Sequence, residues 1–442
     1  MATVSLSSRA AETASFRRLL PPKDWPKIKS LSTSTARQWY EDKKDVPALQ
    51  QFLRKLEVPN IPRPFVGFTT DGKVIDKLFQ YAPHEGAPTA AMIDNVAQLL
   101  RLLSPEQKAC TMFESVEDDM IRIWSNPEFY VNPGGLRLDE YSESVYTAVH
   151  NVLRSSLSPV GYTKALGCCL VNGFLGKLVD GHKVMNEHSY NFRLFGHVSM
   201  TEPWGYTFFG HHLCLAVVVQ GGRMVIGPTF MGAEPDVIDE GPHAGLRLFS
   251  TERQAALKLM QSLSPELKVK TTLWQSVLPK ELPPGRWTAH DERHVGGAGH
   301  DNRVVPYEGC PVSLFDSRQQ NEIVRLFRAF NEYYPDEVLD HRTKLFKDHL
   351  HQTYFAWIGG HDDDAVYYFR IHSPVAFMEF DFHSGVYLTN ETPDKCHIHT
   401  INRIPNRGDY GRALIAQYWE EQRQAHSSGH KNAQTVTVRE LD

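Results

Sequence analysis

The chain has 442 residues and a formal charge of -5, with no basic stripe along it, which excludes nucleic acid as a partner. Hydrophobic residues make up 41% and aromatic residues 11% of the chain, which provides for a large core and excludes wholesale disorder. No stretch approaches the roughly 18 apolar residues of a membrane span, so no membrane partner is expected, and the composition leaves the oligomeric state open.

Residues 1–35 are predicted to form a disordered N-terminal tail. The first twenty, MATVSLSSRAAETASFRRLL, are rich in Ser and Arg, contain one acid, Glu12, and lack the apolar segment of a secretory signal. The six cysteines include no C-x-x-C spacing, which agrees with reduced thiols inside the cell. We therefore expect a cytoplasmic protein, with a mitochondrial presequence as the alternative interpretation.

Three segments predict pairs of helices joined at a corner. In each, an apolar helical pattern ends at Leu-Ser-Pro, where Ser is suited to cap a new helix and Pro to begin it. The corners are Ser104-Pro105, Ser158-Pro159 and Ser264-Pro265, and a fourth segment has a similar outline around Tyr334-Pro335. Either internal duplication or the common use of Ser-Pro caps explains the similarity.

Strand-like runs with period-two or continuous apolar character lie between and after these helices. They span residues 189–200, 205–230, 353–360, 365–373, 375–385 and 396–404. The second run contains a predicted hairpin at Gly221-Gly222, and the last four runs suggest an antiparallel meander followed by a helix over 409–426. The fold class is therefore α+β, with one or more antiparallel sheets and helix-corner-helix units packed around them.

The predicted domain organisation is one large domain over residues 36–426. Two packed halves that meet near the Gly- and Pro-rich loop 282–311 are the alternative, and loops of that length are usually functional or disordered. Residues 427–442 are predicted to be a second disordered tail.

Histidine, with 21 residues, is the most informative residue type, because it is the commonest metal ligand in proteins. Side chains alternate along a strand, and this groups polar residues on one face of two segments: Glu379, Asp381 and His383 on the first, and His397 and His399 on the second. If the segments pair, acids and imidazoles share a face that cannot be an ordinary core. The face holds a metal ion, or else the histidines are half-exposed and paired with the acids.

A Gly-His-His sequence supplies a second group of candidates. His211 and His212 follow Gly210 inside a long apolar run. Adjacent residues of an extended strand face opposite sides, so only one of the two histidines can join a given site. The alternative is a buried histidine bonded to a carbonyl.

Several other polar residues are candidates for substrate contacts. Arg370 and Arg403 have the planar guanidinium that binds a carboxylate in a fork, although either can instead pair with Asp381 or Asp409. Tyr368 is a candidate donor to a developing anion. Asp409 precedes the last predicted helix and is expected to cap it.

In chain order, the motifs SYNFRLFG, EPWGYTFFGHHLCLAVVV, GPTFMGAEP, YYFRIHSPVAFMEFD and HIHTINRIPNRGDYG resemble the bacterial and fungal family filed as domain of unknown function 3500. The resemblance spans Ile93 to Trp419. Since that family has no assigned activity, the resemblance implies only signature positions. They correspond to His211, His212, Glu379, His397, His399, Arg403 and Asp409.

Together these features predict a metal-dependent enzyme that acts on a small organic acid, ester or lactone, most simply by hydrolysis. A divalent ion, Zn or Fe, would be held by ligands drawn from His211, His212, Glu379, His397 and His399. The candidate catalytic residues are Asp381 as general base, Arg370 and Arg403 as carboxylate binders, and Tyr368. Two alternatives remain: a non-haem iron oxidoreductase with two histidines and one carboxylate, and a metal- or ligand-binding protein without catalysis.

Overall fold

A single 12-stranded, mostly antiparallel sheet runs through the part of the chain that the computed structural model describes, residues 15–131 and 134–427. The strands are β1 (Met112–Phe113), β2 (Leu136–Arg137), β3 (Tyr190–Phe195), β4 (Trp204–Gly210), β5 (Leu213–Gln220), β6 (Arg223–Ala233), β7 (Thr272–Trp274), β8 (Cys310–Pro311), β9 (Tyr354–Gly359), β10 (Tyr367–Ser373), β11 (Ala376–Phe382) and β12 (Ile398–Arg403). The predicted α+β class is confirmed, and β9 to β12 form the predicted antiparallel meander.

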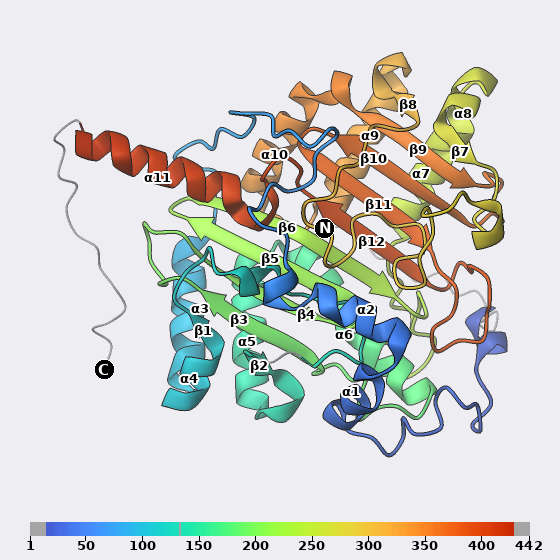
Figure 1. The fold of residues 1–442 in the computed structure, drawn as a ribbon, viewed down its shortest axis with the longest axis horizontal. Helices are drawn as coiled ribbons and strands as arrows, with labels where there is room; N and C mark the ends of the chain where they lie inside the picture. Colours follow the sequence, from blue (N-terminus) through green and yellow to red (C-terminus); the bar gives the residue numbers. More distant parts are fainter. Residues whose placement is uncertain (1–14, 132–133, 428–442) are drawn as a thin grey trace.

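Eleven α-helices in the described residues accompany the sheet (Figure 1). They are α1 (Ala36–Lys44), α2 (Pro47–Lys55), α3 (Thr89–Arg101), α4 (Pro105–Thr111), α5 (Glu143–Ser156), α6 (Pro159–Leu178), α7 (Ser250–Ser262), α8 (Pro265–Thr271), α9 (Ser317–Phe330), α10 (Asp336–Asp348) and α11 (Arg412–Ser427). The three predicted Ser caps are confirmed. The hydroxyls of Ser104, Ser158 and Ser264 each accept a hydrogen bond from the backbone N–H three residues on, which satisfies a donor that the first helical turn leaves free.

The two halves of the molecule repeat one topology. The order helix, helix, short strand, short strand, helix, helix, four long strands describes α3 to β6 and again α7 to β12. β1 is parallel to β3 as β7 is to β9, β2 and β8 pair antiparallel with β3 and β9, and β6 joins β12 in the middle of the sheet. This correspondence favours internal duplication as the source of the repeated corners. The halves join at residues 234–249, whereas the loop 282–311 lies within the second half.

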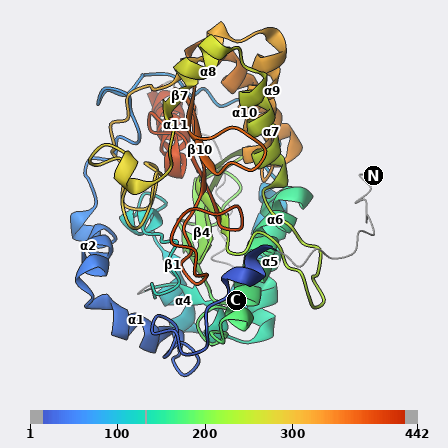
Figure 2. The ribbon, with the colours of Figure 1, turned by 90° about the vertical axis from the view of Figure 1, so that its right-hand side faces the viewer.

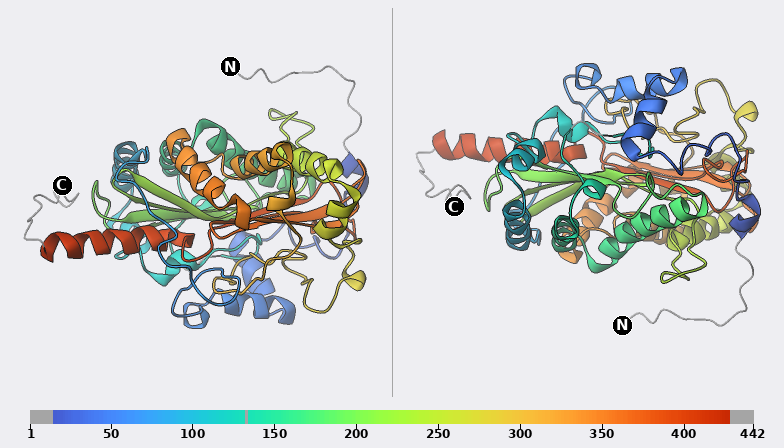
Figure 3. Two further views of the ribbon diagram at one scale, coloured as in Figure 1. Left: turned by 90° about the horizontal axis from the view of Figure 1, so that it is seen from above. Right: turned by 90° about the horizontal axis from the view of Figure 1, so that it is seen from below.

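The sheet has two differently covered faces (Figure 2, Figure 3). Helices α5, α6, α7, α9 and α10 lie against one face, while α1, α2 and the loop after β7 lie on the other. Buried aromatic and aliphatic side chains fill the space under the helices. On the opposite face a smaller apolar cluster forms beneath α1 and α2, and the polar residues of the predicted site lie on this face.

Residues 15–35 belong to the folded body, so the predicted tail is wrong for this segment. Phe16 and Leu31 are 1% and 0% exposed, the Phe16 ring packs edge-on against Phe174, and Arg17 forms an ion pair with Asp239. These partners are distant in the sequence and the apolar residues are too sparse to give a periodic signal, which is why the prediction failed. Residues 1–14 and 428–442 lie outside the described residues.

Within the described part of the chain, no helix is both long enough and apolar enough to cross a bilayer.

Candidate metal centre

The Gly-His-His sequence forms the tight turn between β4 and β5. His212 has a φ of 61°, and its backbone N–H donates to Oδ1 of Asn126 at 2.9 Å. Because the turn is not extended strand, the two rings are not on opposite sides but stack at 3.9 Å between centroids. His211 bonds to Oδ1 of Asn172 on α6 at 2.8 Å. Of the two candidates, only His212 faces the other histidines.

His397 and His399 come from the start of β12, near the middle of the sheet. His399 lies opposite Asp381 on β11 and opposite Gly232 on β6, as the predicted pairing of the two polar faces requires. A Cβ on Gly232 would come within 2.9 Å of the His212 ring and 3.0 Å of the His399 ring. Only glycine at this position lets both imidazoles close over β6.

The Nε2 atoms of His212, His397 and His399 form a nearly equilateral triangle. Their separations are 3.1 Å, 3.3 Å and 3.0 Å. An ion about 2.05 Å from each nitrogen, an ordinary Zn–N distance, would lie only about 1 Å out of the triangle's plane. The three contacts cannot all be hydrogen bonds, because a neutral Nε2 carries either one hydrogen or one lone pair.

Burial favours the neutral form of two of the triangle's imidazoles, those of His212 and His399. All three histidines are buried, and burial lowers the pKa of His212 and His399 well below the ordinary value, with a further lowering from neighbouring imidazoles. Nδ1 of His397 lies 2.7 Å from the carbonyl oxygen of Ser384. A hydrogen on that Nδ1 leaves the lone pair on Nε2. A metal-binding histidine usually donates its other ring N–H to a carbonyl or carboxylate in this way.

Two further groups of possible ligands adjoin the triangle. In the described residues they are His294, His383 and His399, and Glu292, Asp381 and His383; the triangle itself is the third such group. His294 and His383 were not among the predicted ligands. His383 stands on the predicted polar face, so strand alternation could have selected it, whereas His294 belongs to the long loop, where no periodicity indicates direction.

Glu379, a predicted ligand, lies outside the triangle. Its carboxylate accepts a hydrogen bond from the hydroxyl of Tyr368 at 2.6 Å and from the backbone N–H groups of Val295 and Gly296. It pairs across the sheet with Ile401 instead of His399, two residue pairs along from the Asp381–His399 pair. Burial opposes its ionisation, but His294 and the other neighbouring donors outweigh this and lower the pKa of Glu379 to about 2.

Glu379 therefore acts on the loop and on His294. Its Oε2 lies 3.6 Å from Nδ1 of His294. Burial alone would lower the pKa of His294, but the Glu379 carboxylate reverses this and raises it. The hydroxyl of Tyr368 donates its hydrogen to the same carboxylate. In this arrangement Tyr368 therefore has no hydrogen left for its predicted role as a donor to a substrate.

The two predicted arginines, Arg403 and Arg370, differ in whether any of their guanidinium nitrogens lacks a hydrogen-bond partner. Arg403 is saturated: it pairs with Asp409 and Asp301, at 2.6 Å each, and donates to the carbonyl oxygen of Gly296. The predicted carboxylate-binding role of Arg403 is therefore not supported, and Asp409 holds Arg403 and the N–H of Ile404 instead of capping the last helix.

Arg370 keeps unused donors. Its Nη2 pairs with Glu308 at 2.5 Å, but Nε and Nη1 are buried without a hydrogen-bond partner. Arg286 is close to the same Glu308, at 3.4 Å, and also has buried donors without partners, Nε and Nη2. Two guanidinium groups therefore share a single carboxylate.

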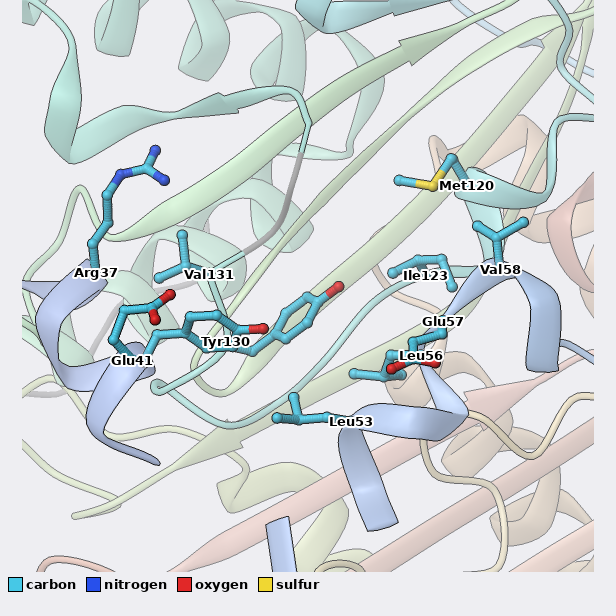
Figure 4. A pocket seen from close by; sticks show the side chains of 11 residues that line it. Arg37, Glu41, Leu53, Leu56, Glu57, Val58, Met120, Ile123, Tyr130 and Val131 are labelled. Atoms are coloured by element: carbon cyan, nitrogen blue, oxygen red, sulfur yellow. The ribbon is translucent and has the colours of Figure 1, made fainter. Parts of the chain in front are cut away.

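Space beside the triangle is small. A cavity of about 20 Å³ is lined by His294 and His399 together with Phe52 of α2 and Trp124, enough for one water molecule. A much larger cavity of about 600 Å³ opens between α1, α2 and residues 120–131 (Figure 4). Because α2 and residues 120–131 contribute to both cavities, these two segments separate the larger one from the histidines.

The fold and the site define an α+β protein with a buried histidine cluster that could bind a metal ion. The model of the family described as "Protein of unknown function (DUF3500)" matches residues 85–412, and the chain belongs to this family, as its motifs suggested. No curated protein and no solved structure matches the chain. The matched region contains every histidine of the triangle, whereas α1 and α2 precede it.

Proposed function

We propose that this protein is a metal-dependent hydrolase of a small organic ester, lactone or amide that carries an acidic group. The observation that carries the proposal is the triangle of three Nε2 atoms of His212, His397 and His399, each 3.0 to 3.3 Å from the next. Three histidines with one open position are the ligand set of the catalytic zinc of carbonic anhydrase, in which zinc-bound water is the nucleophile.

A divalent ion at the triangle would polarise a carbonyl group and lower the pKa of water towards 7. In the hydrolysis of an ester, the oxygen of water adds to the carbonyl carbon, the C–O bond breaks, and the leaving alcohol oxygen takes a proton. His294 lines the cavity beside His399 and is placed to deliver that proton, which the next water replaces. Asp381 was the predicted base, but its Oδ2 faces His383.

The ligand set favours hydrolysis over the iron-dependent alternative. A non-haem iron triad of two histidines and one carboxylate needs an acid beside the ring nitrogens, and Glu379 instead binds the loop backbone. The non-catalytic alternative has one observation in its favour, since the cavity at the triangle holds little more than a water molecule. Under our proposal, substrate enters when α2 and residues 124–127 move apart.

The unused donors of Arg370 and Arg286 support an acidic substrate. On β10, Arg370 lies opposite Glu379 of the neighbouring strand β11. Glu379 is two residues along β11 from Asp381, which lies opposite His399 on β12. Two strand spacings and two residue steps place the Cα atoms of Arg370 and His399 about 12 Å apart. A substrate of a few carbon atoms matches this separation, with its carboxylate at the arginines.

The test begins with the metal content of untagged protein purified without chelators, followed by hydrolysis assays on esters, lactones and amides of dicarboxylic acids. His399→Ala should lose both bound metal and turnover while circular dichroism remains unchanged. The matched control is His351→Ala, which removes an exposed histidine and should keep both. Metal bound without turnover on any substrate would support the non-catalytic alternative, and unchanged metal content in His399→Ala would refute the site.

A further inference from the structure

A second cluster of metal-ligand atoms lies beside the triangle and is not used by the proposed chemistry. Asp381 is on β11, His383 follows that strand, and Glu292 is on the loop that covers it; all three are buried. The ring of His383 lies 3.8 Å from the ring of His399, centroid to centroid. The cluster therefore adjoins the first site directly.

Two polar atoms in this cluster face each other without forming a hydrogen bond. Nε2 of His383 and Oδ2 of Asp381 are 3.2 Å apart, and neither has a hydrogen-bond partner. Glu292, Asp381 and His383 each offer one ligand atom within 4.8 Å of those of the other two. Two ligand atoms each about 2.1 Å from one ion are separated by about 3 Å or slightly more, so the His383–Asp381 distance fits a shared cation.

A single guanidinium holds both carboxyl groups of the cluster. Arg293 is the guanidinium that reaches both acids: its Nε donates to Oδ1 of Asp381 at 2.8 Å and its Nη2 to Oε2 of Glu292 at 2.6 Å. His294, the other basic group that faces Asp381, lies against its own acid, Glu379. One guanidinium thus bonds to both buried carboxyl groups and leaves Oδ2 of Asp381 without a partner, and a buried polar atom without a partner is unfavourable.

The orientation of the carboxylates adds to this. Arg293 binds Oδ1 of Asp381 and leaves Oδ2 directed at His383. The remaining oxygen of Glu292 accepts the backbone N–H of Ser384 at 3.0 Å, which keeps its second lone pair available. Arg293 also donates to the carbonyl oxygens of Val277 and Phe382, so it is held in place and cannot turn to neutralise Oδ2.

We propose that Asp381, His383 and Glu292 bind a second divalent cation beside the ion of the histidine triangle, so that the centre is binuclear. The proposal rests on the proposed function for its first site and extends it. Carboxylate oxygens and one imidazole suit Zn, Mn or Fe. A second cation next to the first would hold the leaving oxygen of the substrate while the first polarises the carbonyl group.

The test is metal stoichiometry in the full-length protein, titrated with Co²⁺ as the probe. The wild-type protein should bind two equivalents, and its electron paramagnetic resonance signal should show magnetic coupling once the second equivalent is added. Asp381→Asn keeps the shape of the side chain and should bind one equivalent with an uncoupled signal. Asp364→Asn, at an exposed acid, is the matched control and should bind two.

The outcomes separate the two sites. If the wild-type protein binds one equivalent, which Asp381→Asn retains and His212→Ala loses, the second site is refuted and the first stands. If His212→Ala still binds two coupled ions, the first site and the proposed function fail. Glu292→Gln repeats the test should Asp381→Asn fail to fold, and it is also expected to bind one equivalent; two equivalents in Glu292→Gln would refute the proposed ligand set.

Discussion

The substitution Gly232→Ala tests the closest approach in the metal centre. The added Cβ would lie 2.8 Å from the carbonyl oxygen of Ile398, 2.9 Å from Cδ2 of His212 and 3.0 Å from Cδ2 of His399. Carbon atoms in proteins rest at about 3.5 Å or more, so the two rings or the strand must move by about half an ångström. Overpacking of this kind costs about 1–3 kcal/mol.

The effect on metal binding should exceed the effect on stability. A shift of about half an ångström in two of three ligands disturbs the triangle itself, and even changes to groups that only support a ligand weaken metal affinity by about 10- to 100-fold. We therefore expect at least a tenfold weaker affinity, measured by competition with a chromophoric chelator, and a lower unfolding temperature. The fold should persist, because Gly232 is not in the left-handed region.

The matched control is Gly134→Ala. A Cβ there meets its nearest neighbour, the Phe113 ring, at 3.5 Å, which is ordinary contact, so metal affinity should be unchanged. If Gly232→Ala binds metal as tightly as Gly134→Ala, the three histidines do not close around one ion over β6, and the reasoning is wrong.

Three further predictions concern residues around the site and the core. Arg370→Ala should raise KM about tenfold or more for acidic substrates and leave neutral esters unaffected, since one charge-assisted hydrogen bond contributes about 1.5–3 kcal/mol; an equal effect on both substrate types would contradict the assignment. Arg403→Ala should destabilise the protein by about 3–5 kcal/mol in urea unfolding, because it leaves Asp409 buried without its arginine and removes one of the two arginines that hold Asp301. A loss below 1 kcal/mol would count against this structural role. Burial, with neighbouring cations, lowers the pKa of His150 from its ordinary 6.5 to about 4, so the contribution of neutral His150 to the free energy of unfolding is complete above pH 6.5 and is lost as the pH falls towards 4. His150→Phe should remove up to about 3 kcal/mol of that acid-dependent loss of stability, and an unchanged pH profile of unfolding would refute this.

Helix α2, which covers the site, lies outside the region that the family model matches, whereas the histidines of the triangle lie inside it. Phe52 of α2 lines the small cavity with His294 and His399, and its ring lies 5.1 Å from that of His290, centroid to centroid. α2 precedes the region that the family model matches. If substrate enters between α2 and residues 124–127, as proposed, access to the centre depends on a segment that the family model does not match.

Local chemistry allowed much of the fold to be predicted from the sequence alone. A Ser-Pro corner needs only its own few residues to cap and begin a helix, and period-two alternation specifies which side chains of a strand share a face. For this reason the helix corners, the meander and the common face of Asp381, His397 and His399 were all predicted correctly. The repeated corners also pointed to the duplicated topology, although the sequence could not distinguish duplication from chance.

The membership of the metal centre was decided by tertiary structure. Strand register places Asp381 opposite His399 and Glu379 two residue pairs away. A register shift of two residues would have placed Glu379 opposite His399 without altering either sequence pattern. The turn at His212 and the loop that carries His294 take their directions from distant contacts with Asn126 and Glu379. Sequence periodicity carries no information about such pairings, because they form between segments that are far apart in the chain and meet only in the folded protein.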